Sequence, residues 1–314
     1  MTPTGWFQVA WSDEVGAGDV RRMHYFGRDM VAWRARSGRL SVMDAYCEHL
    51  GAHLGYGGQV EGEAIACPFH GWQWNAEGRN VCIPYESRPN PGKRMRTYPV
   101  VELNESVYIW HDTHGRDPYF DVPDIFADFD DGRSAGDYHP QQRLYRPGER
   151  LHPQYVLENG VDFAHFKFVH KTPIVPLFTR HDFSGPTSYV DFTITFEGAD
   201  DQAIDDVKSG VEAINGGLGV AVTRSWGMVD NRTISAITPV DDTTCDVRFM
   251  VCIGRQHQRA QDFGQMVIDQ FAADIEIWSH QRYRDTPALA PSEQKSFAEF
   301  RNWAAQFYPE SSTA

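Results

Sequence analysis

Hydrophobic and polar residues alternate over short distances in the first third of the chain. Branched and aromatic residues stand among polar ones in segments such as RLSVMDAYC, EAIACPFHGWQWN and ESVYIW, and the sequences GYGG, AEGR and NPGKR punctuate this region. Short runs of this kind, bounded by Gly, Pro and Asn, are typical of β-strands joined by tight turns. The pattern therefore predicts a small all-β domain, which we place at residues 1–115.

The pattern changes after this domain. Residues 111–140 are acidic, rich in Pro and Gly and without periodicity, so they are interpreted as a linker or a lid-like excursion. Beyond them, the pattern predicts a helical patch at 154–170, strands such as YVDFTITFEG, RTISAITPV and DVRFMVCIG, and a long helix over residues 260–284. We therefore expect an α+β fold, with a second domain at residues 116–314 built on an antiparallel β-sheet flanked by helices.

Composition and charge exclude several classes of protein. The 314 residues, 41% of them hydrophobic and 13% aromatic, are enough for two packed domains. A net charge of -14 disfavours binding to nucleic acids and to anionic membrane surfaces. No apolar run approaches the roughly 18 residues that a membrane span requires, and the five cysteines are too scattered for a disulfide framework. We expect a soluble, cytoplasmic protein.

Two short Cys–His pairs stand in the predicted β domain. Cys47-x-His49 is followed, after seventeen residues, by Cys67-x-x-His70. A structural zinc site usually groups its cysteines in one pair and its histidines in the other. One Cys and one His in each pair suits a two-iron cluster in which thiolates hold one iron and imidazoles the other, as in a Rieske [2Fe-2S] centre. We interpret these four residues as cluster ligands, with zinc as the alternative.

A second group of polar residues lies in the stretch LENGVDFAHFKFVH, residues 157–170. On a helix that turns about 100° per residue, Glu158, Asp162 and His165 share one face. His170 points about 140° away from His165 on a regular helix. The two histidines can therefore hold one metal ion only if the helix ends or bulges between them, and they still need a third ligand.

The long predicted helix supplies the candidate third ligand. Asp274 falls in the middle of an apolar face formed by Val267, Phe271 and Trp278, whereas Asp269 and Glu276 fall on the polar face. An ionised carboxylate on an apolar face is costly unless it is paired or bound to a metal. Two histidines and one carboxylate are the usual ligands of a mononuclear Fe(II) that activates oxygen. We predict Asp274 as the third ligand; the alternative is a hydrogen-bonded core aspartate.

With these motifs in this order, the chain resembles the oxygenase (alpha) component of Rieske non-haem iron oxygenases. The resemblance covers nearly the full length, through CEH, CPFH, ENGVDFAHFKFVH and DIEIW. Asp162, His165 and His170 meet the family's spacing of one Asp and two His. The resemblance implies that His165, His170 and Asp274 bind Fe(II), that Asp162 links this iron to the cluster of a neighbouring subunit, and that Asn159 lies near the iron without binding it.

The resemblance also implies partners and a substrate class. It implies a homotrimer, O2 as co-substrate, and a separate NAD(P)H-dependent reductase or ferredoxin. The segments DIEIWSHQRYRDTPAL and FRNWAAQFYPE are similar to 3-ketosteroid 9α-hydroxylase oxygenases, which implies a monooxygenase that hydroxylates an apolar polycyclic substrate, a steroid.

Several alternatives remain open. Within the family they are an O-demethylase or ring hydroxylase of a smaller aromatic compound, or a sterol desaturase. Outside it they are a non-catalytic Rieske electron-transfer protein and a zinc-stabilised binding protein.

Overall fold

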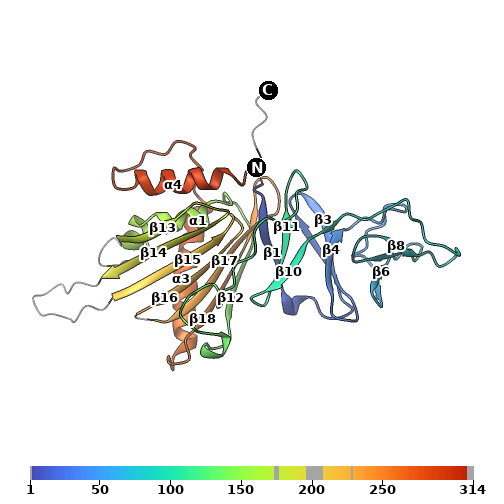
Figure 1. Cartoon of the computed structure of the whole chain (residues 1–314), viewed down its shortest axis with the longest axis horizontal. Helices are drawn as coiled ribbons and strands as arrows, with labels where there is room; N and C mark the ends of the chain where they lie inside the picture. The colour runs from blue at the N-terminus through green and yellow to red at the C-terminus, as the bar shows by residue number, and fades with distance from the viewer. Residues whose placement is uncertain (1, 173–176, 196–207, 228, 310–314) are drawn as a thin grey trace, which may run out of the picture. The chain divides into compact units, whose positions relative to one another are not determined.

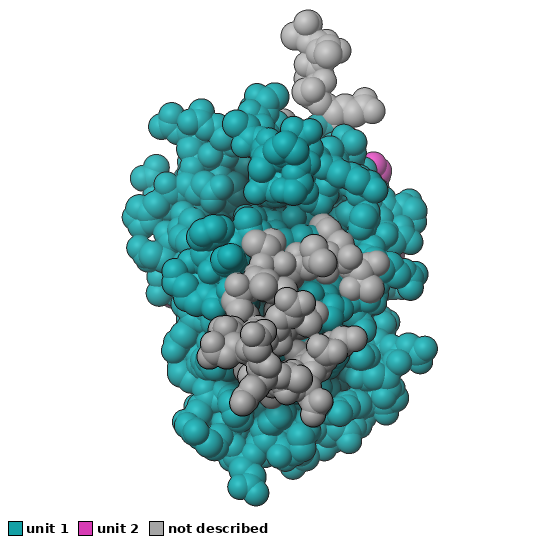
Figure 2. All heavy atoms as spheres, turned by 90° about the vertical axis from the view of Figure 1, so that its left-hand side faces the viewer, with its two compact units in different colours: residues 1–6, 119–239, 243–314 teal, residues 7–118, 240–242 magenta. Residues whose placement is uncertain are grey.

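The computed structural model describes residues 2–172, 177–195, 208–227 and 229–309. Residues Met1–Trp6, Tyr119–Pro239 and Thr243–Ala314 form one compact unit, and Phe7–Pro118 with Val240–Asp242 form a second. Figure 2 colours the first unit teal and the second magenta. We call them the catalytic unit and the cluster unit. Among the described residues, no helix has the length and apolar character that a membrane crossing requires.

The cluster unit consists of small β-sheets. One has the strand order β1-β11-β10, with β1 at Gly5–Trp11, β10 at Val100–Leu103 and β11 at Ser106–His111. The second has the order β2-β3-β4-β9, with bounds Val20–Tyr25, Arg28–Arg34, Leu40–Asp44 and Thr97–Tyr98. The third has the order β5-β6-β7-β8, with bounds Gln59–Glu61, Ala64–Ala66, Gln73–Asn75 and Asn80–Cys82. The predicted N-terminal β domain is confirmed.

A seven-stranded antiparallel sheet with the order β12-β18-β17-β16-β15-β14-β13 forms the catalytic unit (Figure 1). The strands are β12 Gln142–Glu149, β13 Leu177–Asp182, β14 Thr187–Thr195, β15 Lys208–Gly216, β16 Val220–Trp226, β17 Asn231–Pro239 and β18 Cys245–Ile253. Its helices among the described residues are α1 Tyr155–Glu158, α2 Ala164–Phe168, α3 Ala260–Trp278 and α4 Gln294–Ala305, with 3-10 turns at Ala135–Asp137 and Asn159–Val161. A further 3-10 turn, Ser12–Glu14, belongs to the cluster unit. The predicted α+β class, with an antiparallel sheet flanked by helices, is confirmed.

Helix α3 packs on one end of the large sheet through an apolar cluster. Val251 and Phe249 of β18 are buried with Ile268 of α3, and the Phe249 ring stacks on Phe271 with 4.2 Å between the ring centroids. The helix ends at Trp278, six residues before the predicted end at residue 284. The N–H groups of the next residues turn back to carbonyls of the last turn, and the polar, Pro-containing segment that follows has no apolar face to extend the packing.

Helix α2 packs near the other end of the same sheet. Phe163 and Phe166 lie against Val190 and Phe192 of β14, and the Phe166 and Phe192 ring centroids are 4.9 Å apart. The strand register pairs Phe192 with Val211, Val211 with Ser225, Ser225 with Asn231 and Asn231 with Ile253. Directly paired residues of antiparallel strands point to the same side. Helices α2 and α3 therefore cover the same face of the sheet.

Candidate metal centres

The two Cys–His pairs lie on two loops of the cluster unit that have the same backbone geometry. In each loop the N–H of the cysteine donates to the carbonyl five residues later, at 2.9 Å for Cys47 and 2.8 Å for Cys67. The carbonyl of each cysteine accepts the N–H of a glycine four residues later, Gly51 or Gly71. Both glycines have positive φ, +76° and +70°. This conformation favours glycine, so the sequence forms two equivalent loops that each present one Cys and one His.

The histidines of these loops lie side by side. The ring centroids of His49 and His70 are 4.8 Å apart, and His49 stacks on Trp72 at 4.3 Å with the planes almost parallel. The Nδ1 atom of His70 is buried and has no hydrogen-bond partner among the described residues. A buried polar atom normally has a partner, so the Nδ1 atom of His70 fits a metal ligand.

The cysteines are buried and unbridged. Cys47 and Cys67 are 2% and 4% exposed, and neither forms a disulfide. Burial raises the pKa of Cys47 to about 11, and the nearby Cys67 thiol contributes in the same direction. The indole N–H of Trp74 donates to Cys47 Sγ at 3.3 Å. Two such thiols become thiolates at neutral pH when a metal binds them, so this pair also fits a cluster.

The stretch 157–170, which we interpret as a helix that must end or bulge between His165 and His170, is interrupted before His165 as well as after it. Helix α1 ends at Glu158, a 3-10 turn spans Asn159–Val161, and Asp162 is extended, with φ −92° and ψ 91°. A carboxylate oxygen of Asp162 accepts the backbone N–H of His165 at 3.3 Å, and the Asp162 carbonyl is bonded to His165 Nδ1. Asp side chains compete with the helix for backbone groups in this way, and the helix breaks here.

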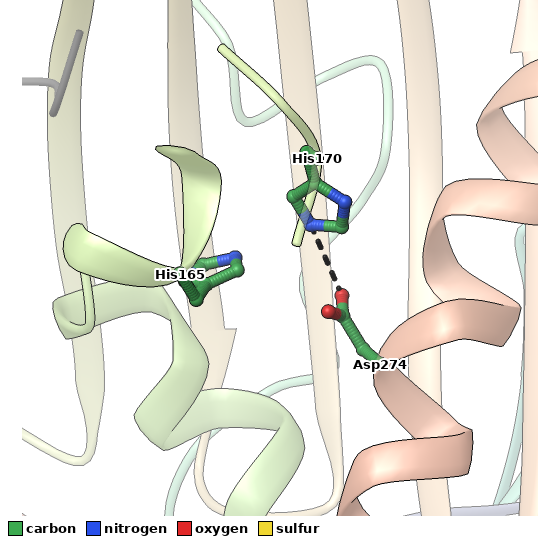
Figure 3. Close-up of side chains that lie close together, drawn as sticks. All are labelled: His165, His170 and Asp274. Carbon is green, nitrogen blue, oxygen red and sulfur yellow. Dashed lines mark ion pairs between the residues drawn. The ribbon is translucent and has the colours of Figure 1, made fainter. Parts of the chain in front are cut away.

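These interruptions of the helix allow the side chains of His165 and His170 to lie next to each other. Helix α2 ends at Phe168, so His170 is outside the helix and is not held at the angle that a regular helix would impose. The centroids of the His165 and His170 rings are 5.0 Å apart. His170 Nε2 lies 3.3 Å from Asp274 Oδ2. In Figure 3 the three side chains converge from three separate segments, and one ligand atom of each lies within 4.8 Å of the others.

The burial and hydrogen bonds of His165, His170 and Asp274 suit the binding of a metal cation by these three residues, which we call the triad. Asp274 is 5% exposed and His165 is 9% exposed. Burial lowers the pKa of His165, which favours the neutral imidazole that a metal requires. The bond from His165 Nδ1 to the Asp162 carbonyl leaves Nε2 directed at the other ligands. Asn159 Nδ2 lies 3.1 Å from His165 Nε2 and 3.5 Å from Asp274 Oδ2, so its amide contacts both ligand atoms.

The other acids near the triad have different surroundings. Glu158 is buried and binds Arg301, with 2.7 Å between Oε1 and Nη2. Asp162 is half-buried, and burial raises the pKa of its carboxyl. Asp269 and Glu276 are exposed on the outer side of α3, as the periodicity predicts. Sequence reasoning missed Arg301: a buried Glu158 signals a need for a cation, but nothing local identifies which arginine supplies it.

Two family models match the chain, one over each domain. Residues 5–99 match the Rieske [2Fe-2S] domain, and residues 109–308 match the 3-ketosteroid 9alpha-hydroxylase C-terminal domain. The chain is 28% identical to a 3-ketosteroid-9-alpha-monooxygenase oxygenase component of Rhodococcus rhodochrous, over 97% of this chain and 83% of that protein. It is 30% identical to cholesterol 7-desaturase nvd of Bombyx mori, over 99% of this chain and 70% of that protein.

Solved structures share the fold. Dicamba monooxygenase bound to dicamba superposes with a TM-score of 0.70 at 15% identity, over 96% of each chain. NdmA of Pseudomonas putida CBB5 with caffeine gives a TM-score of 0.71 at 18% identity, over 96% of this chain and 89% of that one. The resemblance predicted from the motifs is confirmed. The protein is an oxidoreductase that uses dioxygen, with a Rieske [2Fe-2S] cluster and a mononuclear iron as cofactors. The chain belongs to the Rieske oxygenases whose catalytic half is a 3-ketosteroid 9α-hydroxylase C-terminal domain.

Proposed function

We propose that this chain is the terminal oxygenase component of a multicomponent Rieske monooxygenase and that it hydroxylates a steroid. The observation that carries the proposal is the convergence of buried His165, His170 and Asp274 in a chain that also has two Cys–His loops. The names of its relatives, which refer to 3-ketosteroids and cholesterol, support an apolar polycyclic substrate. We assign residues 1–115 to the cluster domain and 116–314 to the catalytic domain.

We assign the cluster to the two loops of equal geometry. Cys47 and Cys67 hold one iron, and His49 and His70 hold the other. When bound, the [2Fe-2S] cluster supplies single electrons and the ferrous iron activates dioxygen. The backbone bonds at each cysteine fix the loops, and the stacking of His49 on Trp72 fixes one imidazole. Trp72 is 7% exposed and shields this side of the site from water.

We assign the ferrous iron to His165, His170 and Asp274. Three protein ligands leave other coordination positions open for O2. Asp162 orients His165 through its carbonyl and carboxylate, and we assign it the further role of connecting this ligand to the neighbouring subunit of a homotrimer. Asn159 contacts two ligand atoms and holds them in place without binding the metal.

The experiment is a metal count followed by turnover. Purified protein is expected to contain about three irons per chain, against about two for a pure Rieske electron carrier and none for a zinc protein. With NAD(P)H and a surrogate reductase or ferredoxin, steroids and small aromatic compounds are then screened by product mass. Gain of one oxygen atom by a steroid supports the proposal. Desaturation of a sterol, or demethylation or ring hydroxylation of an aromatic compound alone, replaces it with the corresponding alternative.

A further inference from the structure

The sheet face under α2 and α3 is apolar at both ends and more polar in the middle. Near α2 the face presents Val190 and Phe192, and near α3 it presents Phe249 and Val251, all buried. The strands between these ends, β15, β16 and β17, lie in the middle of the sheet (Figure 1). On the same face they carry mostly small or polar residues, with Val211 and Ile237 as the branched apolar exceptions: Ala213, Asn215, Ala221, Thr223, Ser225, Asn231, Thr233 and Ser235. The iron ligands are carried by segments that pack on both apolar ends, so this polar strip runs between them.

On the opposite face of the sheet, the neighbouring strands β16 and β17 carry apolar residues at the adjacent position. Val222 of β16 pairs with Ile234 of β17, and both are fully buried. The next pair in the register lies on the face toward the helices: Thr223, one residue after Val222, pairs with Thr233, one residue before Ile234. Valine has nearly the shape of threonine, so strand propensity and packing do not require the two hydroxyls. They are placed only on the side that carries the metal ligands.

The two hydroxyls form a defined recognition element. Thr223 Oγ1 and Thr233 Oγ1 are hydrogen-bonded to each other. Thr233 is 6% exposed and Thr223 is half-buried. A pair of threonine hydroxyls carries two O–H donors, and the bond between them uses one. The second O–H remains for an acceptor outside the pair, and in a buried setting leaving it unmatched is costly.

We propose that the Thr223–Thr233 pair binds a ketone oxygen of the substrate and thereby sets which carbon faces the iron. This inference rests on the proposed function, because it requires a ketone-bearing substrate that lies between this sheet face and the metal ligands. A ketone accepts hydrogen bonds and cannot donate, which matches the single spare donor of the pair.

The test uses the iron-loaded enzyme with two ligands. One is a 3-ketosteroid that carries no other oxygen, and the other is the same steroid with a methylene in place of the ketone. Kd is measured by quenching of tryptophan fluorescence, and the site of hydroxylation by mass spectrometry. Wild type is expected to bind the ketone about three- to tenfold more tightly, as one neutral hydrogen bond allows.

The double variant Thr223→Val/Thr233→Val removes both partners by residues of the same shape, so stability is expected to change little. It should bind the two steroids equally and hydroxylate the ketone at a mixture of carbons. Thr223→Ser should keep the ketone preference. Thr238→Val, on the opposite face of β17, should also keep it and serves as the matched control.

Three results would overturn the inference. In the first, the double variant retains the ketone preference. In the second, the double variant weakens the binding of both steroids equally, which would show that the two threonines contribute only to the shape of the site. Either result leaves the proposed function intact if wild type hydroxylates the ketone. In the third, wild type neither binds nor hydroxylates any steroid, so the proposed steroid hydroxylation fails and the inference fails with it.

Discussion

The pair formed by Glu158 and Arg301 allows a quantitative test of how the iron segment is held. Arg301 Nη2 and Nε donate to the two carboxylate oxygens of Glu158, at 2.7 Å and 3.3 Å. The side chains are 18% exposed for Arg301 and 10% exposed for Glu158. The only other side chain bonded to Glu158 among the described residues is Gln154, at 2.7 Å. The change Arg301→Met keeps most of the side-chain volume and leaves the carboxylate without a cation.

Removing one partner of a buried ion pair costs about 3–5 kcal/mol, because the remaining charge stays desolvated. The bond from Gln154 and the partial exposure of Arg301 place the expected loss at the lower end, about 3 kcal/mol. Glu158→Gln should cost less, about 1 kcal/mol, because Arg301 also donates to the carbonyls of Arg284 and Asp285 and keeps these bonds. The double variant should be more stable than the sum of the two losses indicates, by at least about 1 kcal/mol.

The assay is thermal unfolding of the iron-loaded protein at one scan rate, with bound iron measured in parallel. A loss of about 3 kcal/mol corresponds to a fall in Tm of about 6–12 °C for a domain of this size. Because Asn159 follows Glu158 directly and contacts His165, Arg301→Met should also retain less mononuclear iron. Additive losses in the double variant, or a larger effect of Glu158→Gln than of Arg301→Met, would refute this reasoning.

Further predictions concern each centre and the acid response. Cys67→Ser should abolish the visible and EPR signals of the cluster and leave about one iron per chain; full turnover in this variant would contradict the cluster assignment. Asp162→Asn should retain about three irons yet lower turnover with the native reductase by about tenfold or more, and an unchanged rate would exclude its connecting role. Burial lowers the pKa of His111 from 6.5 to about 4. The unfolded chain therefore binds a proton between these pH values that the folded chain does not, and stability falls as the pH drops from 6.5 toward 4, by up to about 1.4 kcal/mol per pH unit. His111→Phe, which can keep the stacking on Phe26, should reduce this loss in urea denaturation at pH 7 and pH 5, and an unchanged acid response would contradict the assignment.

The fold class could be predicted because its signals are local. Short alternating runs with Gly and Pro between them indicate strands wherever they occur, and they appear as the small sheets of the cluster unit. The sequence indicates that the helix over residues 157–170 must end or bulge between His165 and His170, but not that it also breaks before His165, and the reason is local too. Periodicity counts apolar positions, whereas the break depends on the bonds that Asp162 makes with His165.

The candidate ligands differ in how far the sequence could identify them. The Cys47 and Cys67 loops are each complete within six residues, so spacing alone singles them out. Asp274 was singled out by its place on an apolar helix face, and the structure puts it 3.3 Å from His170. Thr223 and Thr233 carried no signal, because a threonine in a strand is ordinary until the register shows that the two are paired.

By itself the sequence determined which side chains are available for chemistry: two Cys–His loops, two histidines after an aspartate, and one acid on an apolar face. These are properties of turns and helices, whose geometry is set within a few residues. Only the tertiary structure decided that Glu158 binds Arg301 while Asp274 meets His165 and His170. The reason is that the partner of a buried charge is set by which distant segments pack against each other, and for the metal ligands this depends on the register and order of the strands under α2 and α3.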